Sequence, residues 1–301
     1  MAEIEEICAR LCLLTREAWQ KGLPAPMSRE MVRRMLQKGA LRALTLRQVQ
    51  GISEECYLRA EALLSRSAQM YQAIERTLAQ GYDVLLPEDE DWPINLYALG
   101  EQMPQFLFVR GNRELFRRRC VAVAGSRAIE PSTKLLARKC GAQLAREGYV
   151  MVSGGANGVD TEAHCGLFEE GGSLILVPAM PVQRLLGQEE LRHALKENRL
   201  FIVCDTWPEE RFSAPKALMR NHTIYALGDA AIAVASRKKR GGTWDGAMAC
   251  LRGRYTPVYV ADEIGPDFIG NLHLLSQGAN LVCLRRSLGD QLFTKEKWIC
   301  R

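Results

Sequence analysis

Two short turns rich in small residues carry the groups that can hold a phosphate. The first, Gly125-Ser126-Arg127, follows the continuous apolar run 120–124. Its small residues let a phosphate approach the backbone N–H groups, and the planar guanidinium offers a fork of donors suited to phosphate oxygens. We therefore predict a phosphate ligand in this turn. The structural alternative is a tight connection between strand and helix with a solvated arginine.

The second turn follows the next apolar segment, 149–152. It contains Ser153, Gly154, Gly155, Ala156, Asn157, Gly158, Val159 and Asp160. Asp160 and His164 are four residues apart in the helix expected after the turn, so they share one face of it. One interpretation is a carboxylate–imidazole pair at the floor of the site, with Asp160 accepting N–H groups of the turn and His164 contacting a base or a phosphate. The alternative is that Asp160 complements the helix dipole and His164 is a packed, satisfied histidine.

Further cations follow later in the chain. Lys216 and Arg220 are four residues apart in a segment expected to be helical through Ala226, and Asn221 comes next. We predict that the two cations lie on one helix face and point toward the same phosphate site. A surface helix with solvated charged side chains is the alternative.

A third turn of small residues opens another expected helix. It is Gly241-Gly242-Thr243, and it follows the basic run 237–240, which includes Lys238. The first N–H groups of a helix are free to bind an anion, and Thr243 is predicted to cap this helix. Trp244 is predicted either to stack with a base or to pack in the core or at a dimer interface.

The segments that must position these turns alternate between strand and helix from residue 82 onward. Apolar runs predict strands near 83–86, 106–109, 120–124, 149–152, 174–178, 200–204, 230–235, 257–261 and 280–283. Regular alternation with helices favours an α/β fold with a doubly wound, mostly parallel sheet. Ligands of such sheets bind outside the carboxyl ends of the strands, so the three turns are expected to meet at that edge. We assign residues 81–301 to this domain.

Residues 1–80 are predicted to form a small all-helical domain. Apolar residues recur there at helical spacing, and Gly22-Leu23-Pro24-Ala25-Pro26 separates the first helix from the second. The segment 44–53 resembles a short helix, a glycine turn and a helix capped by Ser53, as in helix-hairpin-helix or SAM-like modules that grip phosphates. A plain packing bundle is the alternative. One long helix is expected over 54–80, ended by Gly81.

Composition limits the classes to which the chain can belong. The formal net charge is +5, which permits a polyanionic partner without requiring one, and basic residues gather at 117–119 and 237–240. No basic, apolar leader and no bilayer-spanning run are present, so we expect a cytoplasmic protein without a membrane partner. The 10 cysteines include no Cys-x-x-Cys pair, so we expect reduced thiols and no metal site.

Taken in order along the chain, these motifs resemble those of the DprA/Smf family of bacterial DNA-processing proteins. The resemblance covers about residues 80–284 and rests on the runs 121–127 and 153–160, Ala163-His164, Arg220-Asn221, the glycine-rich helix start, Gly270-Asn271-Leu272 and Gln277-Gly278-Ala279. The segment leading into the domain also fits, with Asp91-Trp92-Pro93, Leu96, Pro104 and the run 108–112.

This resemblance implies an extended Rossmann-like domain that binds single-stranded DNA, dimerises, and loads the recombinase RecA onto the strand in natural transformation and recombination. It implies a binding protein and not an enzyme, with no catalytic residue and no cofactor. Arg127 and Arg220 would carry over as phosphate ligands. Recognition is expected to be independent of base sequence, because stacking and phosphate contacts tolerate any base.

The chain departs from the family pattern at several positions. Asn157 stands where the family usually has Lys or Arg, and His222 replaces the last arginine of an Arg-Asn-Arg signature. The usual Gly-Leu-Asp and Tyr-Pro are absent from 179–183, and Arg240-Gly241-Gly242 replaces a Ser-Gly-Ser turn. Two fewer cations weaken a phosphate track, and the basic run 237–240 can compensate for them.

Two other functions stay open from the sequence. One is that of the lysine-decarboxylase-like phosphoribohydrolases of the same superfamily, which cleave the N-glycosidic bonds of nucleotides. These enzymes have a Gly-Gly-x-Gly-Thr-x-x-Glu motif at the helix start that corresponds to the third turn. The position of that glutamate is Gly246 here, and Asp245 is one residue away, so the acid/base group is missing. The second alternative is a small-nucleotide sensor that uses the same backbone donors without chemistry.

Overall fold

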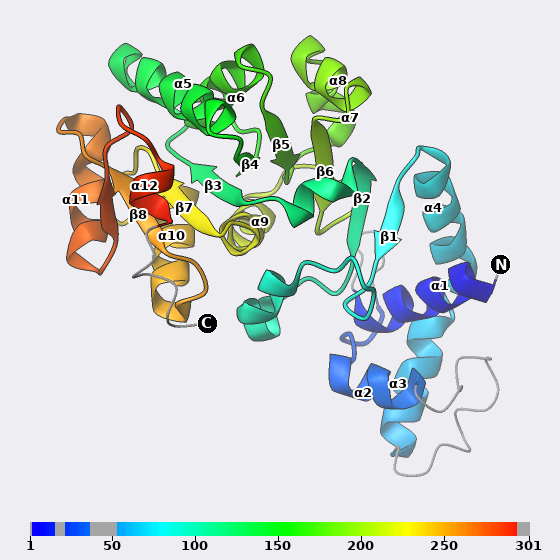
Figure 1. The fold of residues 1–301 in the computed structure, drawn as a ribbon. Coiled ribbons are helices and arrows are strands. Elements are labelled where there is room, and N and C mark those ends of the chain that lie inside the picture. The colour runs from blue at the N-terminus through cyan, green and yellow to red at the C-terminus, as the bar shows by residue number, and fades with distance from the viewer. Residues whose placement is uncertain (1, 16–21, 37–52, 294–301) are drawn as a thin grey trace. The chain divides into compact units, whose positions relative to one another are not determined.

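The computed structural model describes residues 2–15, 22–36 and 53–293 of the 301-residue chain (Figure 1). Contacts within the chain divide it into two compact units, Met1–Asp89 and Glu90–Arg301. Among the described residues no helix is both long and apolar enough to cross a membrane.

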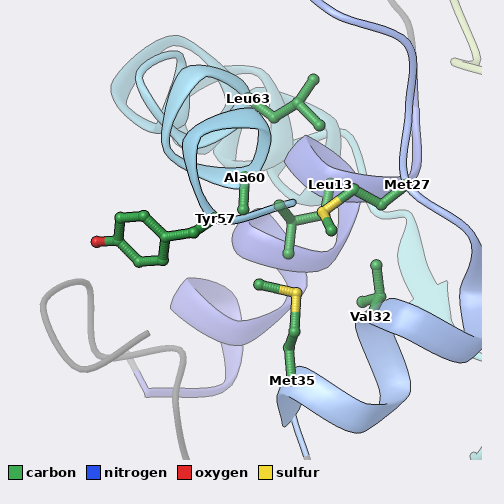
Figure 2. Close-up of a cluster of buried hydrophobic side chains, with 7 residues drawn as sticks. All are labelled: Leu13, Met27, Val32, Met35, Tyr57, Ala60 and Leu63. Atoms are coloured by element: carbon green, nitrogen blue, oxygen red, sulfur yellow. The ribbon is translucent and has the colours of Figure 1, made fainter. Parts of the chain in front are cut away.

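The first unit is mainly helical. It contains α1 (Ala2–Leu14), α2 (Arg29–Leu36), α3 (Glu54–Leu64), α4 (Ser67–Ala79) and the short strand β1 (Asp83–Leu85). Its core includes a cluster of buried apolar side chains from three of these helices and the segment before α2. Figure 2 shows these side chains, which are Leu13, Met27, Val32, Met35, Tyr57, Ala60 and Leu63.

Two helices stand where the sequence predicts one long helix over 54–80. The chain leaves helical geometry at Arg66, between α3 and α4, where φ is −92° and ψ is 6°. Arg66 is buried, and its guanidinium donates to the backbone carbonyls of Cys12 and Thr15 at the end of α1. The break is stabilised by this contact because it satisfies carbonyls that the end of a helix leaves unpaired. Ser53 caps α3 as predicted, whereas the helix–turn predicted for 44–52 lies outside the described residues.

The second unit is built on a mostly parallel sheet. Its strands are β2 (Leu107–Gly111), β3 (Cys120–Ala124), β4 (Val150–Ser153), β5 (Ser173–Leu176), β6 (Leu200–Cys204), β7 (Ala230–Ala233), β8 (Val258–Ala261) and β9 (Asn280–Val282). They are ordered β2-β6-β5-β4-β3-β7-β8-β9, and only β2 runs antiparallel to its neighbour. The α/β, doubly wound fold predicted from the sequence is therefore confirmed, with its strand order reversing at β3.

Helices cover both faces of this sheet. Figure 1 shows α5 (Pro131–Arg146) and α6 (Val159–Glu169) on one side, and α9 (Ala214–Leu227) and α10 (Gly242–Gly253) on the other. The remaining elements are α7 (Val182–Leu185), α8 (Glu189–Lys196), α11 (Ile269–Ser276), α12 (Gly289–Leu292) and the 3-10 segments η2 (Ile94–Gln102), η3 (Arg113–Arg117) and η4 (Pro266–Phe268). Every residue of β3, β4, β6 and β7 is buried, which explains why these strands are continuous apolar runs.

The reversal of the strand order at β3 brings three turns to one edge of the sheet, where ligands of such sheets bind. Because β3 is paired in parallel with both β4 and β7, the turns that follow these three strands lie at one edge of the sheet. They are the turns that begin at Gly125, Gly154 and Val234. The edge at which the sequence predicts a site is therefore the edge where the structure places the three turns.

Candidate functional site

A cavity of about 520 Å³ opens at this carboxyl edge, where the turns after β3 and β7 meet the first residues of α9 and α10. Its wall is formed by residues 124–128, Ala156, Asp160, Phe212, Ala214, Ala217, Leu218, Arg220, Asn221, Arg237, residues 240–243 and Asp245.

The cavity wall includes many of the residues singled out in the sequence. Those that line it are Gly125, Ser126, Arg127, Asp160, Arg220, Asn221, Gly241, Gly242 and Thr243. Those that lie outside the wall are Ser153, Gly154, Gly155, Asn157, Gly158, His164, Lys216, Lys238 and Trp244. The first and third turns therefore form much of the cavity wall, to which the second turn contributes Ala156 and Asp160.

The glycines of the first two turns serve to pack the turns against each other. A Cβ on Gly125 would overlap the side chain of Val159, and a Cβ on Gly158 would overlap the carbonyl oxygen of Ser126. The Val159 N–H donates to that same carbonyl at 3.2 Å. Val159 therefore fills the space where a side chain at position 125 would lie, while Gly125 itself lines the cavity, and phosphate binding in this turn stays a prediction.

Backbone donors for an anion come chiefly from the start of α10. The Ser126 N–H is already used, since it donates to the carbonyl of Ala235 at 2.9 Å. Gly241 precedes α10 with φ +90°, a conformation that glycine adopts without strain. Gly241 is therefore the cap, and Thr243 lies inside the first turn of the helix, contrary to the prediction. The first N–H groups of α10 have no partner within the helix, and the residues that carry them, Gly242 and Thr243, line the cavity.

Arg220 is turned into the protein and is only 4% exposed. Its Nη1 donates to the carbonyl of Val177 at 2.6 Å, and its guanidinium occupies the space that a Cβ on Gly154 would need. Lys216 forms an ion pair with Glu210 at 2.6 Å. The two cations predicted to point together toward the phosphate site therefore differ in place: Arg220 reaches the cavity wall but is held by an internal acceptor, and Lys216 lies outside the wall.

Two carboxylates compensate the buried charge of Arg220. Asp160 is also buried, and burial raises its pKa while the nearby Arg220 lowers it. Burial also raises the pKa of Asp205, while Thr223 and Arg220 lower it. The Thr223 hydroxyl donates to Oδ2 of Asp205 at 2.8 Å. The expected hydrogen bond from the second turn is present, since the Ala156 N–H donates to Asp160 at 3.2 Å. Asp160 thus orders the turn and neutralises Arg220.

His164 is buried on α6, outside the cavity wall. Burial lowers its pKa to about 4, so its ring is neutral at pH 7. Its Nε2 has no hydrogen-bond partner, and no hydrogen bond joins it to Asp160 within the described residues. The position agrees with the packed alternative, although this histidine is not a satisfied one.

We expect His164 to make the protein sensitive to acid. Its folded-state pKa of about 4 lies below the ordinary value of 6.5, so the unfolded chain binds a proton more readily. The contribution of the neutral ring to the free energy of unfolding should therefore be fully present above pH 6.5. It should fall as pH drops toward 4, by at most about 1.4 kcal/mol per pH unit. Urea denaturation of His164→Phe across this range should give a flatter profile, while the exposed His193→Gln should match the unchanged protein. An unaltered profile in His164→Phe would contradict this assignment.

Comparison with models of known protein families finds a match over most of the second unit. The model of the family "DNA recombination-mediator protein A" matches residues 83–292. This chain belongs to that family. The resemblance stated from the motifs is confirmed.

Members of this family with curated descriptions are moderately similar in sequence. The DNA processing protein DprA of Bacillus subtilis is 25% identical over 243 residues, which cover 78% of this chain and 81% of the relative. The DNA processing protein DprA of Streptococcus pneumoniae is 31% identical over 203 residues, 64% of this chain and 68% of the relative.

Solved structures of family members share the fold. The X-ray structure of DprA from Streptococcus pneumoniae superposes with a TM-score of 0.69 at 22% identity, over 93% of this chain and 94% of that one. DNA processing protein A from Helicobacter pylori, described for its single-stranded DNA binding mode, gives a TM-score of 0.54 at 24% identity, over 66% of this chain and 90% of that one.

Neither of the two residues that replace a basic residue of the family pattern, Asn157 and His222, lines the cavity. Asn157 is exposed in the second turn and outside the cavity wall. His222 is half-buried, forms a hydrogen bond with Gln102 at 2.7 Å, and has its pKa lowered by burial. Cations instead enter the cavity from the run 237–240.

Arg237 and Arg240 were not among the predicted ligands, yet both line the cavity. They face each other across a two-residue turn, with Lys238 and Lys239 at its tip. Lys239 has φ +51°, and a Lys-Lys pair carries none of the usual turn signals, so this hairpin could not be recognised from sequence.

The aromatic side chain at the cavity also differs from the predicted one. Trp244 is 9% exposed and packs near His273, which agrees with its core alternative. Phe212, between β6 and α9, lines the cavity instead and is 46% exposed. No strand or helix pattern marks this residue in the sequence.

Proposed function

We propose that this protein binds single-stranded DNA along the cavity at the carboxyl edge of its sheet and acts in DNA processing. The observation that carries the proposal is the set of exposed arginines, Arg127, Arg237 and Arg240, that line one cavity beside the first N–H groups of α10. Guanidinium groups and helix starts are the groups that proteins use to hold phosphates. The similar protein from Helicobacter pylori binds single-stranded DNA.

The charge of the cavity wall favours an anion. No ion pair involves Arg127, Arg237 or Arg240 among the described residues. Of the two carboxylates in the wall, Asp160 is buried beside Arg220, and Asp245 is the exposed one. The accessible side chains of the wall therefore carry three positive charges and one negative charge.

A polymer fits this surface better than a mononucleotide. Lys238 and Lys239 are exposed at the tip of the 237–240 hairpin, next to the two arginines of the wall. The basic surface thus continues beyond the cavity, where a single phosphate group would not reach. A strand with successive phosphates can contact both parts, and each neutralised phosphate adds to binding through the release of counterions.

A nucleotide-cleaving enzyme is less well supported. Gly246 stands where the phosphoribohydrolase pattern has its glutamate, and it is buried with Tyr225 filling the space a side chain would need. Asp245 lines the cavity, but no second carboxylate is free beside it within the described wall. We therefore propose binding without catalysis.

Three further parts of the proposal rest on family membership. They are loading of RecA onto the bound strand during transformation and recombination, formation of a homodimer, and a cytoplasmic location. Single-molecule or filament-assembly assays with purified RecA, together with sedimentation analysis, test the first two.

The central test is a titration of fluorescent oligo-dT at several salt concentrations, beside AMP and NAD. Binding of the oligomer should weaken steeply as salt rises, with no base released from either nucleotide. Tight binding of a mononucleotide with indifference to the oligomer would favour the sensor alternative. Release of a free base would favour the enzyme.

Arg127→Ala is expected to weaken binding of all strand sequences alike. Loss of one phosphate contact should reduce the slope of log affinity against log salt by about one unit. Arg192→Ala is the matched control, because Arg192 is an exposed arginine of α8 outside the cavity wall. A salt slope that stays the same in Arg127→Ala would mean that this side chain does not touch the strand.

A further inference from the structure

The cavity has an apolar side as well as a basic one. Phe212 is 46% exposed and Leu218 is 38% exposed, and both line the cavity. Alanines 128, 214 and 217 lie in the same wall. Exposed aromatic and leucine side chains lack the stabilisation that burial gives, and in the wall of one binding cavity they mark a surface for an apolar ligand group.

Phe212 is held next to the proposed phosphate ligand. The guanidinium carbon of Arg127 lies 5.1 Å from the centre of the Phe212 ring, which is a cation–π contact. A nucleotide presents an anionic phosphate and a flat aromatic base a short distance apart. Arg127 and Phe212 present the complementary pair, a cation and an exposed aromatic ring, at the same short distance from each other.

We propose that Phe212 is the base-stacking residue of this protein, receiving the base of the nucleotide whose phosphate lies at Arg127, with Leu218 extending the apolar surface. Trp244 cannot do this because its side chain is buried. Within the described wall of the cavity Phe212 is the one aromatic side chain. This inference rests on the proposed function and specifies how the same cavity holds the base. Every base has a flat face, so the contact is independent of sequence.

A thermodynamic cycle separates stacking from any effect on the arginine. Two oligomers of equal length are compared, oligo-dT and an abasic strand with the same phosphates, against the unchanged protein, Phe212→Ala and Phe212→Trp. Phe212→Ala should lower the affinity for oligo-dT about tenfold and the affinity for the abasic strand less than twofold. Phe212→Trp should keep the preference for oligo-dT. The salt slope should be the same in all three proteins.

The control is Tyr97→Ala, which removes a ring that is 52% exposed on η2 and outside the cavity wall. It should leave both affinities unchanged, and thermal melts should show that each variant is folded. Equal loss of both oligomers in Phe212→Ala would overturn the inference, because the ring would then act only by positioning Arg127. No loss of either would overturn it as well. In both cases the proposed function stands, whereas failure of the unchanged protein to bind any oligomer would refute both.

Discussion

Gly158→Ala is expected to lower the free energy of unfolding by about 4 kcal/mol and to weaken DNA binding as much as Arg127→Ala does. Gly158 has φ +87° and ψ −123°, a backbone conformation that alanine adopts only under strain. A Cβ at this position would overlap the backbone carbonyls of Ser126 and Arg127. Relief of that overlap must move the first turn away from the second, and the guanidinium of Arg127 moves with it.

A matched glycine separates strain from overlap. Gly171 follows α6 with φ +68°, and nothing lies within 4 Å of a Cβ built there. Gly171→Ala should therefore cost only about 1 kcal/mol and leave DNA binding unchanged. Urea denaturation and the oligo-dT titration measure both effects. Equal destabilisation by the two substitutions would show that the two turns do not depend on their close packing.

The fold could be predicted from sequence because its strands are buried on both faces. A run such as 120–124 has to be apolar at each position when helices cover both sides of the sheet, and that requirement is visible in one sequence. The same rule places the following turns at one edge, so the location of the cavity followed from the strand pattern. The break at Arg66 could not be predicted, since it depends on carbonyls of α1 more than fifty residues earlier.

Within the cavity, residue types indicated the chemistry but not which way each side chain points. Helical spacing placed Arg220 correctly on α9, but the carbonyl of Val177 and the carboxylate of Asp160 that draw it inward come from other parts of the sheet edge. Glycine at position 125 indicated a close approach, but not that the side chain of Val159 fills the space beside it. Such contacts between distant segments leave no local pattern in the sequence.

The buried charges around Arg220 give the second large expected effect. Arg220→Met keeps an unbranched side chain of similar length over Gly154 and removes the guanidinium. Asp160 would then be buried without its cation, and Asp205 would lose a neighbouring positive charge. Breaking a buried charge pair by removing one partner costs about 3–5 kcal/mol, so we expect a loss of that size at pH 7.

The pH dependence of this variant identifies the carboxylate responsible. Burial already raises the pKa of Asp160, and Arg220 opposes that rise, so removing the arginine raises the pKa further. The folded variant then binds a proton more readily than the unfolded chain, whose carboxyl has the ordinary value of 3.8. Its stability should therefore decrease as pH rises from that value through the raised pKa of the folded form.

Neutralising the carboxylate provides the decisive comparison. Asp160→Asn in the Arg220→Met background should restore part of the lost stability at pH 7 and flatten the pH profile, because no buried charge is then left without a partner. Asp160→Asn alone should destabilise the protein, since it leaves Arg220 with one carboxylate fewer. Urea denaturation of the four proteins between pH 4 and 8 measures the coupling. If the double variant is no more stable than Arg220→Met, Asp160 and Arg220 do not act as a pair, and the second turn is held by its backbone packing alone.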